Sequence, residues 1–220
     1  METTMTGGQS STRCSKHAVI AAHPEPASFT MSVAHAYVEA IEALGKEAVL
    51  RDLYRLDFDP VLKAEERLPD GPFTPAPDVA AELAAIKGAD VFVLVYPLWF
   101  GTPPAILKGY IERVVGAGFS RPGHYANRPV HPMLGGKQLL SFSSSGATER
   151  WMSEHGVAKG LQSILDGYLA RAFWMDTPQH VHFGQITADL DADAVNMHLA
   201  KVRIQAELMC QRLQAVQAFA

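Results

Sequence analysis

A histidine and several hydroxyl side chains gather at the start of a predicted helix, in the segment His23-Pro24-Glu25-Pro26-Ala27-Ser28-Phe29-Thr30. The free N–H groups and the positive dipole end of a helix N-terminus favour an anion. The segment contains neither a GxGxxG fingerprint nor a Walker A loop. It therefore predicts a phosphate site of another kind, and the alternative is that Ser28 serves only as an N-cap.

Two large aromatic residues stand beside a glycine and three prolines in a second segment, Tyr96-Pro97-Leu98-Trp99-Phe100-Gly101-Thr102-Pro103-Pro104. Such a composition predicts a rigid apolar wall that suits a planar aromatic ligand. The alternative is that Trp99 and Phe100 close the core or an oligomer interface.

A run of small polar residues forms the third segment, Ser143-Ser144-Ser145-Gly146-Ala147-Thr148. A permissive backbone of this kind approaches a ligand closely and points N–H groups at it, although a solvated turn has the same composition. A serine hydrolase that uses Ser144 or Ser145 with His155 is a further alternative. The run does not match GxSxG, because Ser141 or Phe142 stands where the first glycine belongs.

The elements that must position these segments alternate regularly along the chain. Apolar runs predict strands at residues 17–22, 47–53, 91–96 and 137–143, and a fifth strand that ends within 180–184. Helical spacing of apolar residues predicts helices at 29–44, 78–87, 106–114, 161–172 and 194–218. Five rounds of strand and helix favour an α/β fold: a flavodoxin-like three-layer sandwich with a parallel sheet of order 2-1-3-4-5 and helices on both faces. The three polar or aromatic segments then follow strands one, three and four at the carboxyl edge of the sheet, where such folds bind ligands.

Composition limits the domain organisation and the partners. We expect a disordered segment at 1–16, a single domain at 17–220 and a long surface excursion at 55–77, which is rich in proline. Nineteen Lys and Arg against 23 Asp and Glu argue against nucleic acid. Two cysteines without CxxC spacing indicate a reducing, cytoplasmic location, and neither a signal peptide nor an apolar run of membrane-spanning length is evident. His180 and His182 share a strand face, but no third ligand is obvious. Solvated or hydrogen-bonded histidines are the commoner case, and we expect no metal site.

The three segments together resemble the flavin-dependent NAD(P)H:quinone oxidoreductases with a flavodoxin-like fold. The resemblance covers roughly residues 17–185 and is sharpest in YPLWFGTPPAILKGYIERVVGAGF, residues 96–119. It implies three sets of flavin contacts. The phosphate end would be held by His23, Ser28, Phe29 and Thr30. The ring would be lined by Pro97, Leu98, Trp99 and Phe100. The polar edge of the ring would be contacted by Ser143, Ser144, Ser145 and Gly146.

The resemblance also implies an activity. Bound FAD or FMN, with FAD slightly favoured, would accept hydride from NAD(P)H and then reduce a quinone or a similar flat acceptor in a ping-pong reaction. The family uses a tyrosine and a histidine after the serine run; Trp151 stands at the tyrosine position here, and His155 is the candidate histidine. A homodimer is implied as well, with Tyr125 as the candidate to overhang the substrate or, alternatively, an ordinary surface aromatic. The alternative functions are a flavin-binding electron carrier or regulatory subunit, and reduction of azo, nitro or chromate substrates.

Overall fold

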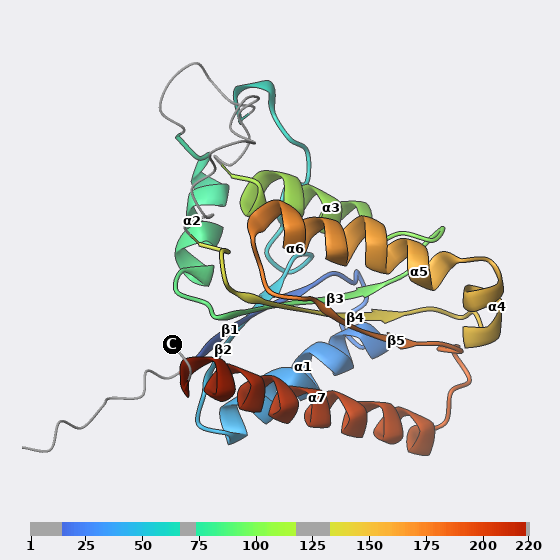
Figure 1. The fold of residues 1–220 in the computed structure, drawn as a ribbon. Helices are drawn as coiled ribbons and strands as arrows, with labels where there is room; N and C mark the ends of the chain where they lie inside the picture. Colours follow the sequence, from blue (N-terminus) through green and yellow to red (C-terminus); the bar gives the residue numbers. More distant parts are fainter. Residues whose placement is uncertain (1–14, 67–73, 118–132, 219–220) are drawn as a thin grey trace, which may run out of the picture.

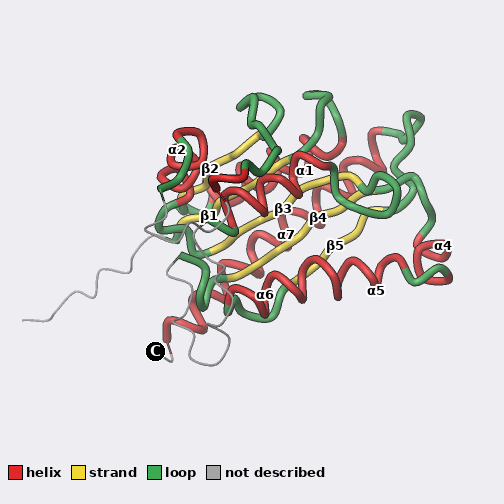
Figure 2. Tube along the Cα trace, turned by 90° about the horizontal axis from the view of Figure 1, so that it is seen from above, coloured by secondary structure: helices red, strands yellow, loops and turns green. Residues whose placement is uncertain are grey.

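Five short strands form one parallel sheet, as the sequence predicts. The strands are β1 (Lys16–Ala21), β2 (Glu47–Asp52), β3 (Val91–Pro97), β4 (Gln138–Ser144) and β5 (Gln179–Phe183). Their order in the computed structural model, which describes residues 15–66, 74–117 and 133–218, is β2-β1-β3-β4-β5 (Figure 2). Every residue of β3 and β4 is buried, which is typical of central parallel strands covered on both faces.

Helices cover the two faces of this sheet (Figure 1). One layer holds α1 (Phe29–Ala43) and α7 (Ala192–Ala218), and the other holds α2 (Pro77–Ile86), α3 (Ala105–Tyr110) and α6 (Gly167–Phe173). Alternate strand residues enter different cores: Ala18 and Ile20 pack with the α2, α3 and α6 layer, and Val19 and Ala21 pack with α1 and α7. Neither core would be covered without its helical layer.

Several helix boundaries differ from the predicted ones. The helix predicted at 161–172 begins earlier, as α5 (Val157–Leu161), and reaches α6 through a π-helical turn, η3 (Gln162–Asp166). A short helix that the sequence did not predict, α4 (Glu149–Glu154), precedes it, and a second π-helical turn, η2 (Ile111–Val115), extends α3. The closing helix begins two residues before the predicted start, at Ala192.

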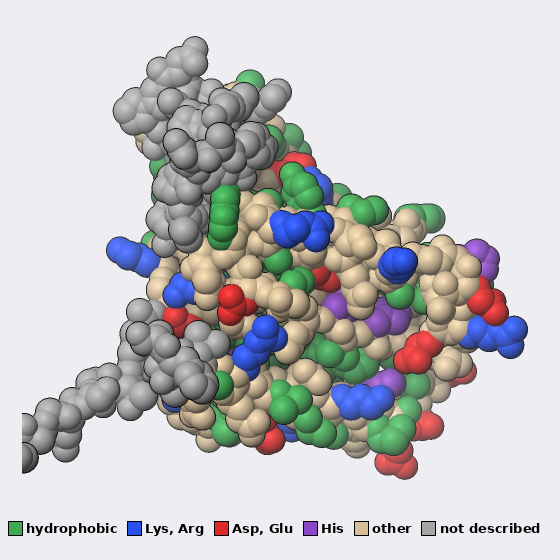
Figure 3. Space-filling model, in the orientation of Figure 1, with side chains coloured by type: hydrophobic (Ala, Val, Ile, Leu, Met, Phe, Trp, Pro, Cys, Tyr) green, Lys and Arg blue, Asp and Glu red, His purple; other side chains and the backbone are tan. Residues whose placement is uncertain are grey.

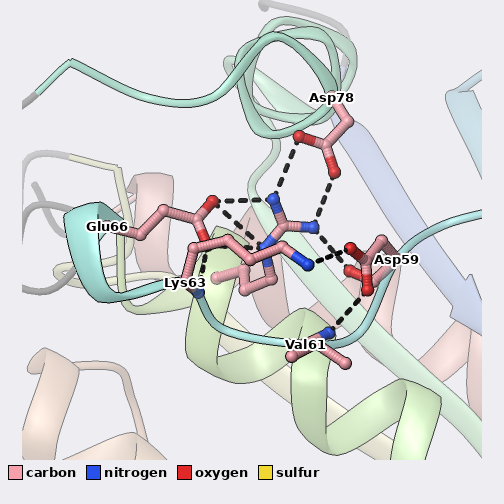
Figure 4. Close-up of polar contacts among 6 residues, drawn as sticks. Asp59, Val61, Lys63, Glu66 and Asp78 are labelled. Carbon is pink, nitrogen blue, oxygen red and sulfur yellow. Dashed lines mark hydrogen bonds and ion pairs between the residues drawn. The ribbon is translucent and has the colours of Figure 1, made fainter.

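The predicted surface excursion is anchored by a buried arginine. The Arg113 side chain, 2% exposed, binds the carboxylates of Glu66 and Asp78 and the Asp59 carbonyl (Figure 4). These bonds hold the pKa values of Glu66 and Asp78 below their usual range. The Asp78 carboxylate binds Arg113 and makes no capping hydrogen bond to α2; the helix starts with Pro77, whose fixed φ suits that position. The 3₁₀ turn η1 (Ala64–Glu66) brings Glu66 to this cluster.

Two predictions fall partly or wholly outside the described residues. Tyr125 lies in the undescribed range 118–132, and residues 1–14 of the predicted N-terminal segment are likewise undescribed. Lys16, placed in that segment by the sequence analysis, is the first residue of β1. Within the described ranges, no helix has both the length and the apolar character that crossing a membrane requires.

Candidate active site

The three segments singled out in the sequence meet at the carboxyl edge of the sheet. β1, β3 and β4 are neighbours, and their parallel register brings their ends together. The His23 ring lies 5.7 Å from the Trp99 ring between centroids, and the Thr30 Oγ1 lies 3.5 Å from the Ser144 Oγ. The structure therefore brings residues from all three segments into one region.

The N-terminus of α1 faces this region. Ser28 is the N-cap, and its hydroxyl accepts a hydrogen bond from the Met31 N–H at 3.3 Å. The N–H groups of Phe29 and Thr30 lie in the first turn, where an α-helix offers them no internal partner. The N-cap interpretation of Ser28 is thus confirmed, and the first turn still presents donors that suit a phosphate.

The loop that leads into α1 is held in place by its own side chains. The His23 Nδ1 accepts a hydrogen bond from the Glu25 N–H at 3.0 Å. Arg55 donates to the carbonyls of His23 and Pro24 at 2.9 and 2.6 Å. Arg55 was not among the site residues predicted from the sequence, and its guanidinium adds positive charge beside the predicted anion site.

Trp99 and Phe100 project from a tight turn. The backbones of Trp99 and Thr102 bond to each other in both directions, and both central residues have positive φ: 53° at Phe100 and 80° at Gly101. Gly101 adopts such a φ at no cost, whereas an aromatic residue there is strained. Phe100 is 106% exposed and Trp99 39% exposed. The alternative that these rings close the core is therefore wrong, and they remain available to a ligand or to a second subunit.

The residues of the serine run differ in what their backbone groups bind. The Ser144 carbonyl accepts the Leu98 N–H at 2.7 Å, which ties the aromatic turn to β4. The Ser145 N–H, which was expected to point at a ligand, instead donates to the Phe183 carbonyl at 3.0 Å. A Cβ at Gly146 would meet only the Ile186 carbonyl oxygen, at 3.8 Å, so the backbone there is open to close approach.

Ser143 does not face a ligand through its hydroxyl. It is 1% exposed, and its Oγ lies 2.7 Å from the His180 Nε2 and 2.8 Å from the His182 Nδ1. The His180 Nδ1 in turn lies 2.5 Å from a carboxylate oxygen of Asp166. The two histidines were expected to be solvated or hydrogen-bonded rather than metal ligands, and they are hydrogen-bonded, whereas the part of Asp166 was not predicted. The sequence signal that could have indicated this network was the alternation of Ser141, Ser143 and Ser145 on one strand and of two histidines on the next.

His155 lies on the exposed side of α4 and is not paired with a serine in the structure. The described contacts of its ring go to Trp151: its Nδ1 lies 2.9 Å from the Trp151 carbonyl oxygen, and the two rings stack at 4.4 Å. Ser143, His180 and Asp166 have the order of a hydrolytic triad, but a nucleophile must be accessible to its substrate. The buried Ser143 is not, and the geometry gives the hydrolase alternative no support.

A cavity of about 760 Å³ adjoins the region on the β5 side. It runs from Gly146 to the first turns of α7, where His198 and Lys201 line it. The Phe29 ring lies 5.7 Å from the His198 ring, so the cavity begins beside the N-terminus of α1. The His198 Nδ1 is shielded from solvent and has no hydrogen-bond partner among the described residues. The described ranges contain no group of residues arranged to hold a metal ion.

Comparison with known proteins agrees with this architecture. The flavodoxin-like fold family matches residues 15–208. An uncharacterized NAD(P)H oxidoreductase of Haemophilus influenzae is 32% identical over 87% of this chain and 95% of its own. The NAD(P)H dehydrogenase [quinone] 1 of Cavia porcellus is also 32% identical, over 67% of this chain, but the match spans only 59% of its length.

The solved structures give the same result. An NAD(P)H:quinone oxidoreductase from Methanothermobacter marburgensis superposes with a TM-score of 0.75 at 25% identity, covering 88% of this chain and 96% of the other. An FMN-dependent NADH-azoreductase from Bacillus anthracis, 20% identical with a TM-score of 0.63 over 89% and 99% of the two chains, shares the fold. The chain therefore belongs to the flavodoxin-like fold family, among the NAD(P)H oxidoreductases.

Proposed function

We propose that the chain is a flavoprotein that oxidises NAD(P)H and passes two electrons to a quinone or a similarly flat acceptor. The observation that carries the proposal is the strained and exposed aromatic turn at Trp99 and Phe100, beside the N–H groups that begin α1. The fully exposed Phe100 ring, held at positive φ, adds nothing to the buried core, whereas it suits stacking against a planar ring. The relatives named for NAD(P)H oxidation and quinone reduction support the same activity.

The donor set of the site fits a flavin. The first turn of α1 would hold a phosphate, with His23 and Arg55 keeping the preceding loop in place. Trp99 and Phe100 would line the ring, and Gly146 would permit its polar edge to approach the β4 loop. When bound, the flavin supplies the hydride chemistry, while this chain orients it and excludes water from one side.

The oxidised nicotinamide would leave before the quinone binds in the same place, and this order of release and binding defines a ping-pong reaction. Steady-state rates measured with NADH or NADPH and a quinone should give parallel double-reciprocal lines. An electron carrier or a regulatory subunit should show almost no such turnover. Azo, nitro and chromate compounds are alternative acceptors to be assayed with the same reduced protein.

We propose FAD rather than FMN as the cofactor. The cavity beside α1 gives room for the second half of FAD, and Lys201 and the unpartnered His198 Nδ1 offer polar contacts there. Mass spectrometry of the cofactor released by denaturation would identify it. Release of FMN alone would contradict this choice of cofactor but leave the reductase activity standing.

We also propose a homodimer, as the family resemblance implies. Ile164 and Tyr168 leave 78% and 62% of their surfaces exposed around the η3 turn, which is apolar area suited to a second copy. Light scattering of the purified chain tests this directly. A monomer at all concentrations would contradict the dimer.

The decisive experiment is the visible spectrum of the purified chain with added FAD or FMN, followed by bleaching with NAD(P)H. Trp99→Ala should weaken flavin binding about two- to tenfold, because stacking of an aromatic pair contributes roughly 0.5–1.5 kcal/mol. Val61→Ala is a control, since Val61 is 59% exposed and its described hydrogen bond goes to Asp59 rather than to the three segments. Failure to bind either flavin would overturn the proposed function.

A further inference from the structure

A polar stripe runs along one face of the two strands at the β5 edge of the sheet. Alternate strand residues share a face, and the register pairs Ser141 with His180 and Ser143 with His182. Figure 3 shows histidine side chains along this edge, between the two helical layers. Ser145 follows β4 on the same side of the run and belongs to the loop where the flavin is proposed to bind.

These side chains form one continuous chain of hydrogen bonds. The Ser145 Oγ lies 3.1 Å from the His182 Nε2, and the His182 Nδ1 lies 2.8 Å from the Ser143 Oγ. The Ser143 Oγ lies 2.7 Å from the His180 Nε2, and the His180 Nδ1 lies 2.5 Å from the Asp166 Oδ2. Each imidazole and the Ser143 hydroxyl are therefore bonded on two sides. The Ser145 hydroxyl is bonded on one side, and its other side faces the loop.

Asp166 forms the buried end of this chain of hydrogen bonds. It sits on the η3 π-helical turn and is 1% exposed, and its second oxygen accepts a hydrogen bond from the Ser141 hydroxyl at 2.6 Å. Within the described ranges, His180 is the ionisable base that faces it. A buried carboxylate is costly without partners, and the Ser141 hydroxyl and the His180 ring are the partners of its two oxygens.

The chain has two self-consistent proton arrangements. With neutral histidines, His180 donates to Asp166 through Nδ1 and accepts from Ser143; His182 donates to Ser143 through Nδ1 and accepts from Ser145. Ser145 is then an acceptor toward the loop. With one more proton, His180 donates from both nitrogens, Ser143 donates to the His182 Nδ1, and the His182 Nε2 donates to Ser145. Ser145 is then a donor toward the loop.

One proton converts the first arrangement into the second. A hydronium ion of the solvent gives a proton to the Ser145 Oγ and becomes water, and the Ser145 proton passes to the His182 Nε2. The His182 Nδ1 proton passes to the Ser143 Oγ, and the Ser143 proton passes to the His180 Nε2. The number of protons balances, and the added charge rests on His180 beside Asp166.

We propose that Asp166, His180, Ser143, His182 and Ser145 form a proton relay that stores one proton beneath the β4 loop and switches Ser145 from acceptor to donor. The link to electron transfer rests on the proposed function. There, the donating Ser145 hydroxyl would hold the negative charge that two-electron reduction brings to this edge of the site.

The surroundings of the relay disfavour a charge on His182. Burial and the neighbouring His180 lower the pKa of His182, while the charge of Glu149 on α4 opposes that shift. From β3, the Tyr96 ring packs edge-on against His180, and burial and Asp166 raise its pKa so that it stays neutral. The cavity that His182 lines carries further charged groups from three segments: Glu149, Arg150, Asp189, Asp191 and Lys201.

Imidazole ¹⁵N NMR of the full chain without cofactor tests the relay. In the neutral arrangement, both His180 and His182 carry their proton on Nδ1. On acidification, His180 should become doubly protonated, and in the same titration His182 should exchange its Nδ1 proton for one on Nε2. Two histidines that titrate independently, or a His182 that keeps its tautomer, would overturn the proposal. A merely structural hydrogen-bond network does not require this coupled change.

Two serine variants form a matched pair. Ser143→Ala removes the hydroxyl between the histidines and should abolish the coupling. Ser141→Ala removes another buried hydroxyl on the same strand face, one bonded to Asp166 but outside the chain, and should preserve it. Persistence of the coupling in Ser143→Ala would refute the relay, and the wild-type titration decides the question even where a variant does not fold.

The loaded protein separates the two proposals. Ser143→Ala should bind flavin as the wild type does but lose about 100-fold or more in the rate of quinone reduction, since one preorganised donor to a developing negative charge is worth roughly 10²–10³-fold. A chain that shows the tautomer exchange and binds no flavin would support the relay and overturn the proposed function. Unchanged quinone reduction in Ser143→Ala, together with independent titrations, would overturn the relay alone.

Discussion

Replacing Gly109 with alanine tests whether the excursion is packed directly on α3. A Cβ at Gly109 would lie 2.2 Å from the Pro60 carbonyl oxygen and 2.5 Å from the Pro60 Cα. Both are backbone atoms, so no rotamer change relieves the overlap. The excursion itself is held by Arg113, whose guanidinium binds Glu66 and the Asp59 carbonyl.

The magnitude follows from two opposing effects. Overpacking a well-filled site costs roughly 1–3 kcal/mol, and an overlap with backbone belongs at the upper end. Alanine in place of a helical glycine restores about 1 kcal/mol. We therefore expect Gly109→Ala to lower the free energy of unfolding by about 2 kcal/mol.

Gly160→Ala is the matched control. Gly160 also lies in a helix, α5, and a Cβ there would meet nothing within 4 Å. This variant should gain the helical contribution of up to about 1 kcal/mol without any cost. Urea unfolding followed by circular dichroism, with unchanged m-values, measures both variants. Equal shifts in the two variants would refute the packing argument, as would full rescue of Gly109→Ala by Pro60→Ala, which leaves the clashing backbone atoms in place.

Three further predictions concern the arginine cluster, a buried histidine and the aromatic turn. Arg113→Met should lower the free energy of unfolding, measured in urea, by roughly 3–5 kcal/mol, because Glu66 keeps a buried charge without its partner. A decrease below about 1 kcal/mol would contradict this. Burial lowers the pKa of His17 to about 4 from 6.5, so the unfolded chain binds more protons between these values. The free energy of unfolding should therefore fall by about 3 kcal/mol as the pH drops from 7 to 4, and His17→Asn should remove that part of the slope. Phe100→Gly relieves a positive φ of 53° and should leave the melting temperature equal or higher while it weakens flavin binding; a marked loss of stability would show that Phe100 serves the fold.

The sheet and its order could be predicted because each strand carries a local signal. The run Val91–Pro97 is buried throughout, and so is Gln138–Ser144, in which Leu139, Leu140 and Phe142 are the apolar residues. The convergence of the three segments then followed from the parallel topology alone. The tight turn at Phe100 needed more than composition, since no sequence signal assigns a positive φ to phenylalanine.

The polar network could not be predicted for a different reason. His180 and His182 were visible as a pair, but their partners lie on the neighbouring strand and depend on a register that local sequence does not specify. Asp166 reaches His180 from a π-helical turn, and the helical spacing of residues 161–172 predicts an ordinary helix there. The short α4 was missed because it offers only one buried residue, Met152, and hence no periodic pattern.

Helix α3 connects the aromatic turn of the proposed ligand site with the excursion at residues 55–77. Its first end follows the aromatic turn, where Phe100 is strained and exposed, and a strained backbone persists only where its surroundings hold it. Backbone bonds from Leu98 to Ser144 and between Trp99 and Thr102 restrain that end. The far end is held by the contact of Gly109 with Pro60 and by the buried Arg113. A ligand-facing turn needs a rigid support to keep its geometry, so substitutions at Gly109, remote from the ligand, should weaken flavin binding beyond what the loss of stability explains.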